Sequence, residues 1–313
     1  LRRRQRQMCI RDRDVTLVDC VIQGNIRNYG TGEVRFEAPQ ITPESTATKP
    51  SEVYKPGATL DRTLEYGGKT VPIYRDRPLN VFSDVDFIWT GEENENQRRL
   101  EYLGGEFRTR YGIDVSSFQG EIDWDAVADD NIGFAMVRVG FRGTGTGSLN
   151  TDKYYEQNIR GAMRAGLETG VYFFAQAVTV EEAIEEADYV ISLLDGLDIN
   201  GPVAYDWEMH DSTYRVYGTS PEMATACAVA FCERIKDAGY TPMVYGGTYV
   251  TYMKYDQGAL ADYLSWYPEY KSEKSEKLCP TLVYHMDYWQ FSSSRAVAGI
   301  NGRVDMNIQF IRR

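Results

Sequence analysis

Two acidic residues, close together on one predicted strand, are the part of this sequence best suited to chemistry. Residues 202–208 have the sequence PVAYDWE. Side chains alternate between the two faces of a β-strand, so Asp206 and Glu208 share one face, while Tyr205 and Trp207 share the other. A pair of carboxyl groups at one site is the apparatus that cleaves a glycosidic bond. The sequence therefore predicts a glycosidase built around Asp206 and Glu208.

Two further acids are expected to join this pair. Asp114 and Asp305 each lie at or near the end of a predicted strand. In a barrel of parallel strands, functional side chains collect at the carboxyl ends of the strands, so we expect all four acids to converge there. Carboxylates that are close together repel one another, which raises the pKa of at least one of them and supplies a proton donor near neutral pH.

Other kinds of site have less support. Asp206, Glu208 and His210 alternate and could chelate a metal, but the strand is expected to end at 208 and the chain has only two histidines. The nucleophile elbow of a serine hydrolase, G-x-S-x-G, is absent from the sequence. The glycine-rich segment 140–147 lacks the G-K-[ST] ending of a phosphate-binding loop and is interpreted as a rim loop. We therefore expect neither a metal nor another cofactor.

Sugar-binding sites combine flat apolar side chains with hydrogen-bonding groups. Several aromatic residues fall at the ends of predicted strands, where they could form such a surface. The predicted substrate-binding residues are Tyr172, Phe174, Tyr245, Trp266, Trp289 and Gln290.

From residue 104 onward, strands and helices alternate, which is typical of an α/β fold with a parallel sheet. The predicted helices are 124–130, 154–165, 180–194 and 221–238, with a weaker signal at 259–264. The later strands, at 266–267, 284–291 and 304–310, have only short connections between them. The expected fold is therefore an irregular (β/α) TIM-like barrel over 104–313, with a closing side of nearly bare strands.

The chain before residue 104 is predicted to be a small β-rich module over 14–103. It contains one hairpin around Gly67-Gly68 and a second hairpin-like stretch before residue 103. Residues 41–57 are rich in Pro, Ser, Thr and Lys and are interpreted as a linker or extended segment. Residues 1–13 resemble translated cloning or adaptor sequence, so we exclude them from fold reasoning as a non-native head. We expect the module to brace the barrel.

Charge and composition narrow the range of partners. The net charge is −12, and residues 1–13 hold six Arg and one Asp, so residues 14–313 carry −17. This excess of negative charge argues against nucleic acid as a partner. No apolar run approaches the roughly 18 residues of a transmembrane helix. The five cysteines lack zinc-site spacing and are expected to be buried free thiols. We expect a monomer.

Five segments in combination resemble the glycoside hydrolase family 25 muramidases. They are GIDVSSFQGEIDWDAV at 112–127, GVYFFAQA at 170–177, PVAYDWE at 202–208, MVYGG at 243–247 and WQFSSSRAVAGINGRVDMNIQF at 289–310. The resemblance implies an irregular (β/α) barrel that hydrolyses the β-1,4 bond between N-acetylmuramic acid and N-acetylglucosamine of peptidoglycan, without a metal. It covers residues 110–313 and does not explain 14–105.

Carried over by position, the resemblance also implies roles for the four acids. Glu208 would be the acid/base, and Asp206 would orient or stabilise the acetamido group of the substrate or act as a nucleophile. Asp114 and Asp305 would be supporting acids in the mouth. Because the sugars carry N-acetyl groups, our hypothesis is a substrate-assisted route with net retention. A chitinase-like glycosidase and a non-catalytic wall-binding protein remain alternatives. We expect such a protein to act outside the cell or at the cell envelope.

Overall fold

The computed structural model describes residues 15–18, 34–37, 47–91 and 97–313. The chain divides into two compact units, residues 1–46 and residues 47–313. In the first unit, β1 (Val15–Val18) and β2 (Val34–Glu37) pair in parallel. The predicted head at 1–13 and the first part of the predicted linker, 41–46, lie outside the described residues, whereas 47–57 are described.

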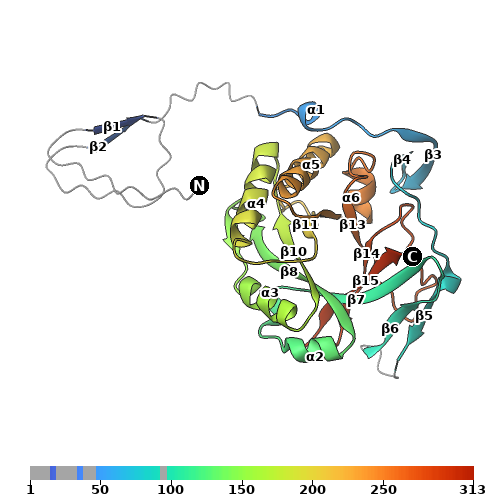
Figure 1. Ribbon diagram of the computed structural model, residues 1–313. Coiled ribbons are helices and arrows are strands. Elements are labelled where there is room, and N and C mark those ends of the chain that lie inside the picture. The colour runs from blue at the N-terminus through green and yellow to red at the C-terminus, as the bar shows by residue number, and fades with distance from the viewer. Residues whose placement is uncertain (1–14, 19–33, 38–46, 92–96) are drawn as a thin grey trace. The chain divides into compact units, whose positions relative to one another are not determined.

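Eight strands of the second unit close into a barrel (Figure 1). In ring order they are β7 (Phe107–Val115), β8 (Ile132–Arg142), β10 (Glu168–Ala175), β11 (Val203–Trp207), β12 (Pro242–Tyr245), β13 (Leu264–Pro268), β14 (Tyr288–Arg295) and β15 (Val304–Arg312). The strands from β7 to β14 run parallel, whereas β15 is antiparallel to both β14 and β7. The short strand β9 (Leu149–Thr151) pairs with β8. The predicted α/β class and irregular TIM-like barrel are confirmed.

Helices follow the first strands of the barrel. They are α2 (Trp124–Asp129), α3 (Tyr155–Arg164), α4 (Val180–Leu193) and α5 (Pro221–Asp237), each close to its predicted range. The side chains of Asp123, Thr179 and Ser220 accept hydrogen bonds from backbone N–H groups in the first turns of α2, α4 and α5, which fixes where those helices begin. None of the helices that the structure describes is long and apolar enough to cross a membrane.

The helix after β12 lies earlier in the chain than predicted. The structure places α6 at Thr248–Met253, and the helix expected at 259–264 is not formed. The Asp256 carboxylate accepts hydrogen bonds from the N–H groups of Gly258 and Ala259, which holds this stretch in a turn. Most residues of α6 are β-branched or aromatic and have low helix propensity, so tertiary packing must stabilise it.

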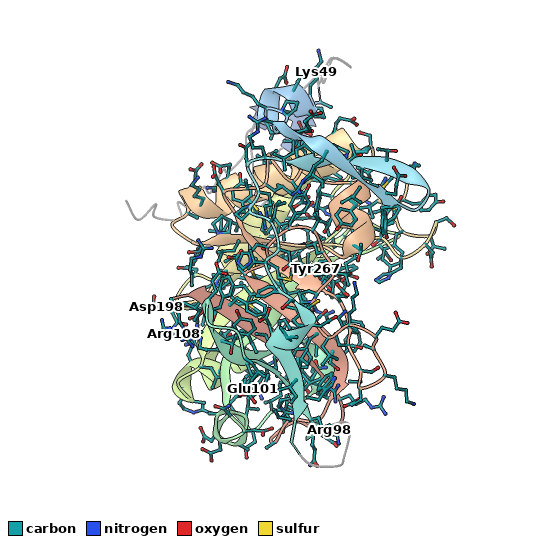
Figure 2. All side chains as sticks on the ribbon, turned by 90° about the vertical axis from the view of Figure 1, so that its right-hand side faces the viewer. Lys49, Arg98, Glu101, Arg108, Asp198 and Tyr267 are labelled. Atoms are coloured by element: carbon teal, nitrogen blue, oxygen red, sulfur yellow. The ribbon has the colours of Figure 1, made fainter. Side chains whose placement is uncertain are left out.

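Residues 47–91 and 97–103 run from α5 to the side of the barrel where no helix follows a strand, and this side faces the viewer in Figure 2. The segment comprises α1 (Pro50–Val53), the hairpin of β3 (Thr59–Tyr66) and β4 (Lys69–Tyr74), the 3₁₀ turn η1 (Asp84–Asp86) and the hairpin of β5 (Phe87–Thr90) and β6 (Arg99–Tyr102). Both expected hairpins are present. Gly67 and Gly68 adopt φ values of 57° and 73°, as a tight two-residue turn requires.

This segment contributes core side chains to the barrel. The ring of Phe87 packs edge-on against Trp289 of β14 at 5.4 Å between centroids. Arg77 is buried, and its Nη1 donates to the carbonyl groups of Leu260 and Tyr263 at 2.9 and 3.2 Å. These contacts join this part of the predicted module to the barrel.

Side chains of the barrel strands alternate between the barrel interior and the outer shell. The interior cluster consists of Phe134, Met136, Ala204, Met243, Tyr245, Trp266 and Tyr288. Along β11, Val203, Tyr205 and Trp207 belong to the outer cluster, whereas Ala204 faces the interior. The two faces predicted for this strand are therefore confirmed, and Asp206 continues its interior face.

Candidate active site

Four carboxyl groups meet at one end of the barrel. Asp114 and Asp206 are the penultimate residues of β7 and β11, and Glu208 directly follows β11. Asp305 is the second residue of β15 and lies opposite Asp114 in the strand register. The sequence-based placement of Asp305 at the end of a parallel strand is wrong. Because β15 is antiparallel, its beginning lies beside the ends of the other strands.

The barrel interior beneath the acids is filled by aromatic rings. Phe134 and Tyr288 pack edge-to-face at 5.2 Å between centroids. Gly112, two residues before Asp114, leaves room for this ring, since a Cβ atom there would lie 2.3 Å from Phe134. Because these rings are closely packed, they form a rigid layer beneath the acids. The polar side chains above this layer can therefore be held in fixed positions.

The four acids line a cavity of about 220 Å³. Five of the six predicted substrate-binding residues also line it: Tyr172, Phe174, Tyr245, Trp266 and Gln290. The remaining lining residues are Ser116, Phe118, Gln119, Arg138 and Tyr270. The structure thus brings together acids, aromatic rings and amide groups from most of the barrel strands.

Trp289 is not part of this cavity, and its predicted role in substrate binding is wrong. Its side chain is fully buried, and its Nε1 donates to the carbonyl group of Glu269 at 3.0 Å. The ring packs in the outer shell against Phe87 and Phe291. The alternation of β14 explains the difference: Tyr288 and Gln290 face the interior, so Trp289 between them faces outward.

Asp114 is held by a chain of hydrogen bonds whose directions are determined. Its Oδ2 accepts from Gln290 Nε2 at 2.8 Å and from Asn307 Nδ2 at 2.7 Å. The oxygen of each amide is in turn occupied, because Tyr245 donates to Gln290 at 3.1 Å and Trp266 donates to Asn307 at 2.7 Å. An indole N–H can only donate, so Asn307 must present its nitrogen to the carboxyl group. The network fixes Asp114 as a hydrogen-bond acceptor.

Burial and mutual repulsion raise the pKa values of three of the acids. Burial and the neighbouring Asp305 raise the pKa of Asp114 well above its ordinary value. Burial and the nearby Glu208 likewise raise the pKa of Asp206, whereas the positive charge of Arg138 lowers it. The pKa of Asp305 rises to about 6 for the same two reasons, burial and Glu208. The cavity can therefore hold both a proton and a negative charge near neutral pH.

Asp206 presents an oxygen that lacks a hydrogen-bond partner. Its side chain is almost completely buried, and among the described residues Oδ1 contacts no donor. A buried carboxylate oxygen without a partner is costly, so such a group in a cavity is a candidate for ligand contact. Asp206 is therefore suited to accept a hydrogen bond from a bound molecule.

Glu208 lies at the edge of the cavity and is only partly buried. Its Oε2 is 2.6 Å from Nε2 of His210, and the His210 side chain is 62% exposed. β11 ends at Trp207, so the alternation that would place Asp206, Glu208 and His210 on one strand face stops before His210. The arrangement supports a hydrogen-bonded pair of Glu208 and His210 rather than a strand-borne metal site.

Arg138 and Phe118 are among the five lining residues that were not predicted from the sequence. Arg138 pairs with the buried Asp152, with Nη2 at 2.8 Å from Oδ2, and its guanidinium lies 5.1 Å from the Phe118 ring centroid. The Phe118 side chain is 84% exposed and also borders a second, more open cavity. A charge within the apolar strand 134–139 was a signal for Arg138. No comparable signal identified Phe118, which lies in the 3₁₀ turn η3 (Ser117–Gln119).

A family model described as glycosyl hydrolases family 25 matches residues 113–300 of this chain. An autolytic lysozyme of Clostridium acetobutylicum is 26% identical over 197 residues, which are 63% of this chain and 54% of the relative. Lysozyme M1 of Streptomyces globisporus is 27% identical over 201 residues, which are 63% of this chain and 66% of the relative. The chain thus spans about half the length of the clostridial lysozyme and two thirds of the streptomycete enzyme.

The fold is also similar to that of solved lysozyme structures. The crystal structure of a bacterial lysozyme from Streptomyces coelicolor matches with a TM-score of 0.51 and 26% identity. The match covers 63% of this chain and 90% of the other. It therefore includes nearly the whole of the other chain, whereas more than a third of this chain lies outside it.

Proposed function

The chain belongs to glycosyl hydrolases family 25, and from this membership we propose that it cleaves the β-1,4 bond between N-acetylmuramic acid and N-acetylglucosamine in peptidoglycan. The observation that carries the proposal is the cavity at the end of the barrel, where Glu208 and Asp206 lie beside Asp114 and Asp305. Two carboxyl groups are sufficient for glycosidic cleavage if one holds a proton while the other is charged.

The electrostatics of the cavity support different roles for Glu208 and Asp206. Glu208 raises the pKa of Asp206, so the charge of Asp206 depends on its neighbours. The positive charge of Arg138 favours the charged form that the proposed mechanism requires of Asp206. Glu208 is also the more exposed of the two and can reach a glycosidic oxygen at the cavity edge. In the proposed mechanism Glu208 is therefore the general acid and Asp206 is the charged partner.

The unpartnered oxygen of Asp206 supports a substrate-assisted route. Oδ1 would accept a hydrogen bond from the acetamido N–H of the sugar and direct the acetamido oxygen toward the anomeric carbon. That oxygen forms a bond to the anomeric carbon as the bond to the leaving sugar breaks, and Glu208 gives its proton to the leaving oxygen. Glu208 then takes a proton from water, which attacks the anomeric carbon and opens the cyclic intermediate. Two displacements at one carbon give net retention.

The shape of the site is consistent with a polymeric sugar substrate. Tyr172, Phe174 and Trp266 supply flat apolar surfaces beside the acids. Phe118 and Gln119 are shared with the adjoining open cavity, which offers room for sugars on one side of the cleaved bond. A continuous groove of this kind would bind several sugars of one glycan strand, with no cofactor required by the proposed steps.

The proposed partner is the glycan strand of peptidoglycan, and the proposed place of action is the cell envelope or the medium outside the cell. Its relatives are an autolytic lysozyme and a lysozyme by name, which supports a wall substrate. We propose that the chain acts as a monomer, since all the acids of the cavity come from one chain.

Digestion of purified, insoluble peptidoglycan tests the proposal. The wild-type chain should release disaccharide-peptides with a reducing muramic acid end, detected by mass spectrometry, with the retained anomer first by proton NMR. Glu208→Gln should lower the rate about 100- to 10,000-fold, because general acid catalysis contributes that much. The matched control is Glu106→Gln, which alters an exposed glutamate just before β7, at the opposite end of the barrel.

Three results would contradict the proposal in different ways. Products with a reducing glucosamine end would place the cleaved bond one sugar away. An inverted first anomer would exclude the substrate-assisted route. Binding to peptidoglycan without any release of product, by wild type as well as by Glu208→Gln, would favour a wall-binding protein.

A further inference from the structure

The main chain of Glu208 is held by the side chain of Gln176, which directly follows the neighbouring strand β10. Trp207, the last residue of β11, is paired in register with Ala175, the last residue of β10. Gln176 and Glu208 are the next residues after these two strands, and Gln176 Nε2 donates to the carbonyl oxygen of Glu208 at 2.8 Å. Beyond the ends of the two strands, this side chain takes the place of the next strand-to-strand hydrogen bond.

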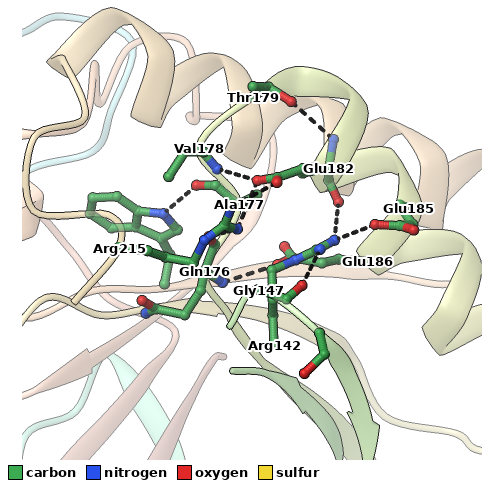
Figure 3. Close-up of polar contacts among 12 residues, drawn as sticks. Arg142, Gly147, Gln176, Ala177, Val178, Thr179, Glu182, Glu185, Glu186 and Arg215 are labelled. Atoms are coloured by element: carbon green, nitrogen blue, oxygen red, sulfur yellow. Dashed lines mark hydrogen bonds and ion pairs between the residues drawn. The ribbon is translucent and has the colours of Figure 1, made fainter. Parts of the chain in front are cut away.

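The backbone of Gln176 is itself fixed from both sides (Figure 3). Its N–H donates to Oε1 of Glu186 at 3.0 Å, and its carbonyl oxygen accepts from Nη1 of Arg215 at 2.8 Å. The side chain of Gln176 is fully buried. A residue held at three points in this way has little freedom to move relative to its neighbours.

Two ion pairs anchor these contacts. Arg142 Nε contacts Glu186 Oε1 at 2.7 Å, and both side chains are buried. Arg215 forms a two-bond contact with Glu182, with Nη1 and Nη2 at 2.8 and 2.7 Å from the two carboxylate oxygens. Planar, two-bond arginine–carboxylate contacts fix orientation as well as distance.

The residues after Gln176 belong to the same assembly. The carbonyl oxygen of Ala177 accepts from Nε1 of Trp207 at 3.1 Å, and the N–H of Val178 donates to Glu182 at 2.9 Å. Trp207 is the residue immediately before Glu208. The segment 176–178 therefore contacts the catalytic strand on both sides of the Trp207–Glu208 peptide bond.

We propose that Gln176 is the positioning residue of Glu208: it transmits the rigidity of the two arginine–glutamate pairs to the acid/base carboxyl group. The inference rests on the proposed role of Glu208 in glycan cleavage. Gln176 does not line the cavity and acts only through the main chain of Glu208. Loss of its amide donor should leave substrate binding intact and slow the chemical step, because small displacements of a catalytic group are costly to rate.

The test is Gln176→Met, which keeps the length of the side chain but removes the donor. We expect kcat on a soluble glycan oligomer to fall about 10- to 100-fold while KM changes by less than about twofold. The matched control is Gln257→Met. Gln257 is also buried, and its Nε2 donates to the carbonyl group of Thr251 at 3.3 Å, away from the acids. Its substitution should lower the melting temperature by a similar amount and leave kcat unchanged.

Two further measurements separate positioning from a purely structural role. In the Glu208→Gln background, Gln176→Met should cause no additional loss, because the group that it positions is already absent. Hydrogen exchange of the peptide spanning 203–212 should be faster in Gln176→Met than in wild type and in Gln257→Met, whether or not the protein is active on glycan.

The inference would be overturned if Gln176→Met kept its kcat, if the two losses added, or if exchange at 203–212 did not change. If wild type released no product from peptidoglycan, the proposed function would fail instead. The exchange measurement would then still decide whether Gln176 holds the Glu208 main chain.

Discussion

At the residue scale, Asp305 shows the electrostatic cost of placing four carboxyl groups in one cavity. Its pKa rises from 3.8 to about 6 because it is buried and lies near Glu208. A carboxyl group whose pKa is raised in the folded state stabilises that state while it is protonated. This contribution is present in full below about pH 4 and is lost as the pH rises through about 6. At neutral pH the folded protein therefore holds a charge that opposes folding.

Asp305→Asn should therefore stabilise the protein at neutral pH. A shift of this size, reduced for partial solvent screening, corresponds to about 1–2 kcal/mol. We expect a gain in melting temperature of about 2–8 °C at about pH 7, which shrinks toward zero at about pH 4, where the wild-type carboxyl group is protonated. Thermal unfolding followed by circular dichroism at both pH values measures this.

A control aspartate should behave differently. Asp198, labelled in Figure 2, is exposed and lies outside the cavity, so Asp198→Asn serves as the matched control. If Asp305→Asn were less stable than wild type at about pH 7, or if its advantage persisted unchanged at about pH 4, the repulsion inferred for the mouth would be wrong.

The residue types of the site could be predicted from the sequence, but most of their partners could not. The acids Asp206 and Glu208 followed from the alternation of one strand. Asn307, which holds Asp114, and Gln176, which holds Glu208, act through hydrogen bonds between segments far apart in sequence. A single sequence contains no signal for such contacts. Trp289 shows the opposite error, since a shift of one position along a strand moves a side chain to the other face.

At the element scale, residues 77–91 and 97–103 pack against the last barrel strands, which no helix follows. Arg77 is central to this contact because its buried guanidinium donates to two carbonyl groups of the segment before β13. Burial lowers its pKa. Removal of the guanidinium would leave the carbonyl groups of Leu260 and Tyr263 without this donor inside the protein. Unsatisfied buried acceptors are costly, so Arg77 is expected to matter for folding.

Arg77→Met should destabilise the chain by about 2–4 kcal/mol, because two buried hydrogen bonds to a charged donor are lost. Arg75→Met is the matched control, since Arg75 is exposed and lies two residues away. Urea unfolding followed by tryptophan fluorescence compares the two variants. Equal unfolding midpoints would show that Arg77 does not anchor the segment to the barrel.

The elements themselves were predictable to different degrees, for physical reasons. Helices α2, α4 and α5 begin at capping residues that are local in sequence, so their ranges could be predicted closely. Helix α6 has no such signal and depends on packing, and it was missed. The reversed direction of β15 follows from its pairing with β14 and β7, which is a tertiary property.

At the scale of the whole molecule, charge should influence how the chain approaches its proposed substrate. Residues 14–313 carry a net charge of −17, a count that includes the four acids of the cavity. Cell walls that contain anionic polymers should repel such a protein at long range. Repulsion between exposed charges extends over roughly the Debye length, about 30 Å at 0.01 M salt and about 8 Å at 0.15 M. Association should therefore be slower in dilute buffer.

We expect the initial rate of product release from walls that retain anionic polymers to rise about 3- to 10-fold between about 10 mM and about 150 mM NaCl, because salt screens the repulsion that slows encounter. On walls stripped of these polymers, and on neutral glycan oligomers, the rate should change much less. The pair of substrates separates screening of long-range charge from any effect of salt on the catalytic acids, which would be common to both. A rate that fell with salt on the anionic walls would instead indicate local attraction between the wall and the protein. Cationic residues near the cavity would then guide the approach despite the net charge, and Arg138 would be the first of them to test.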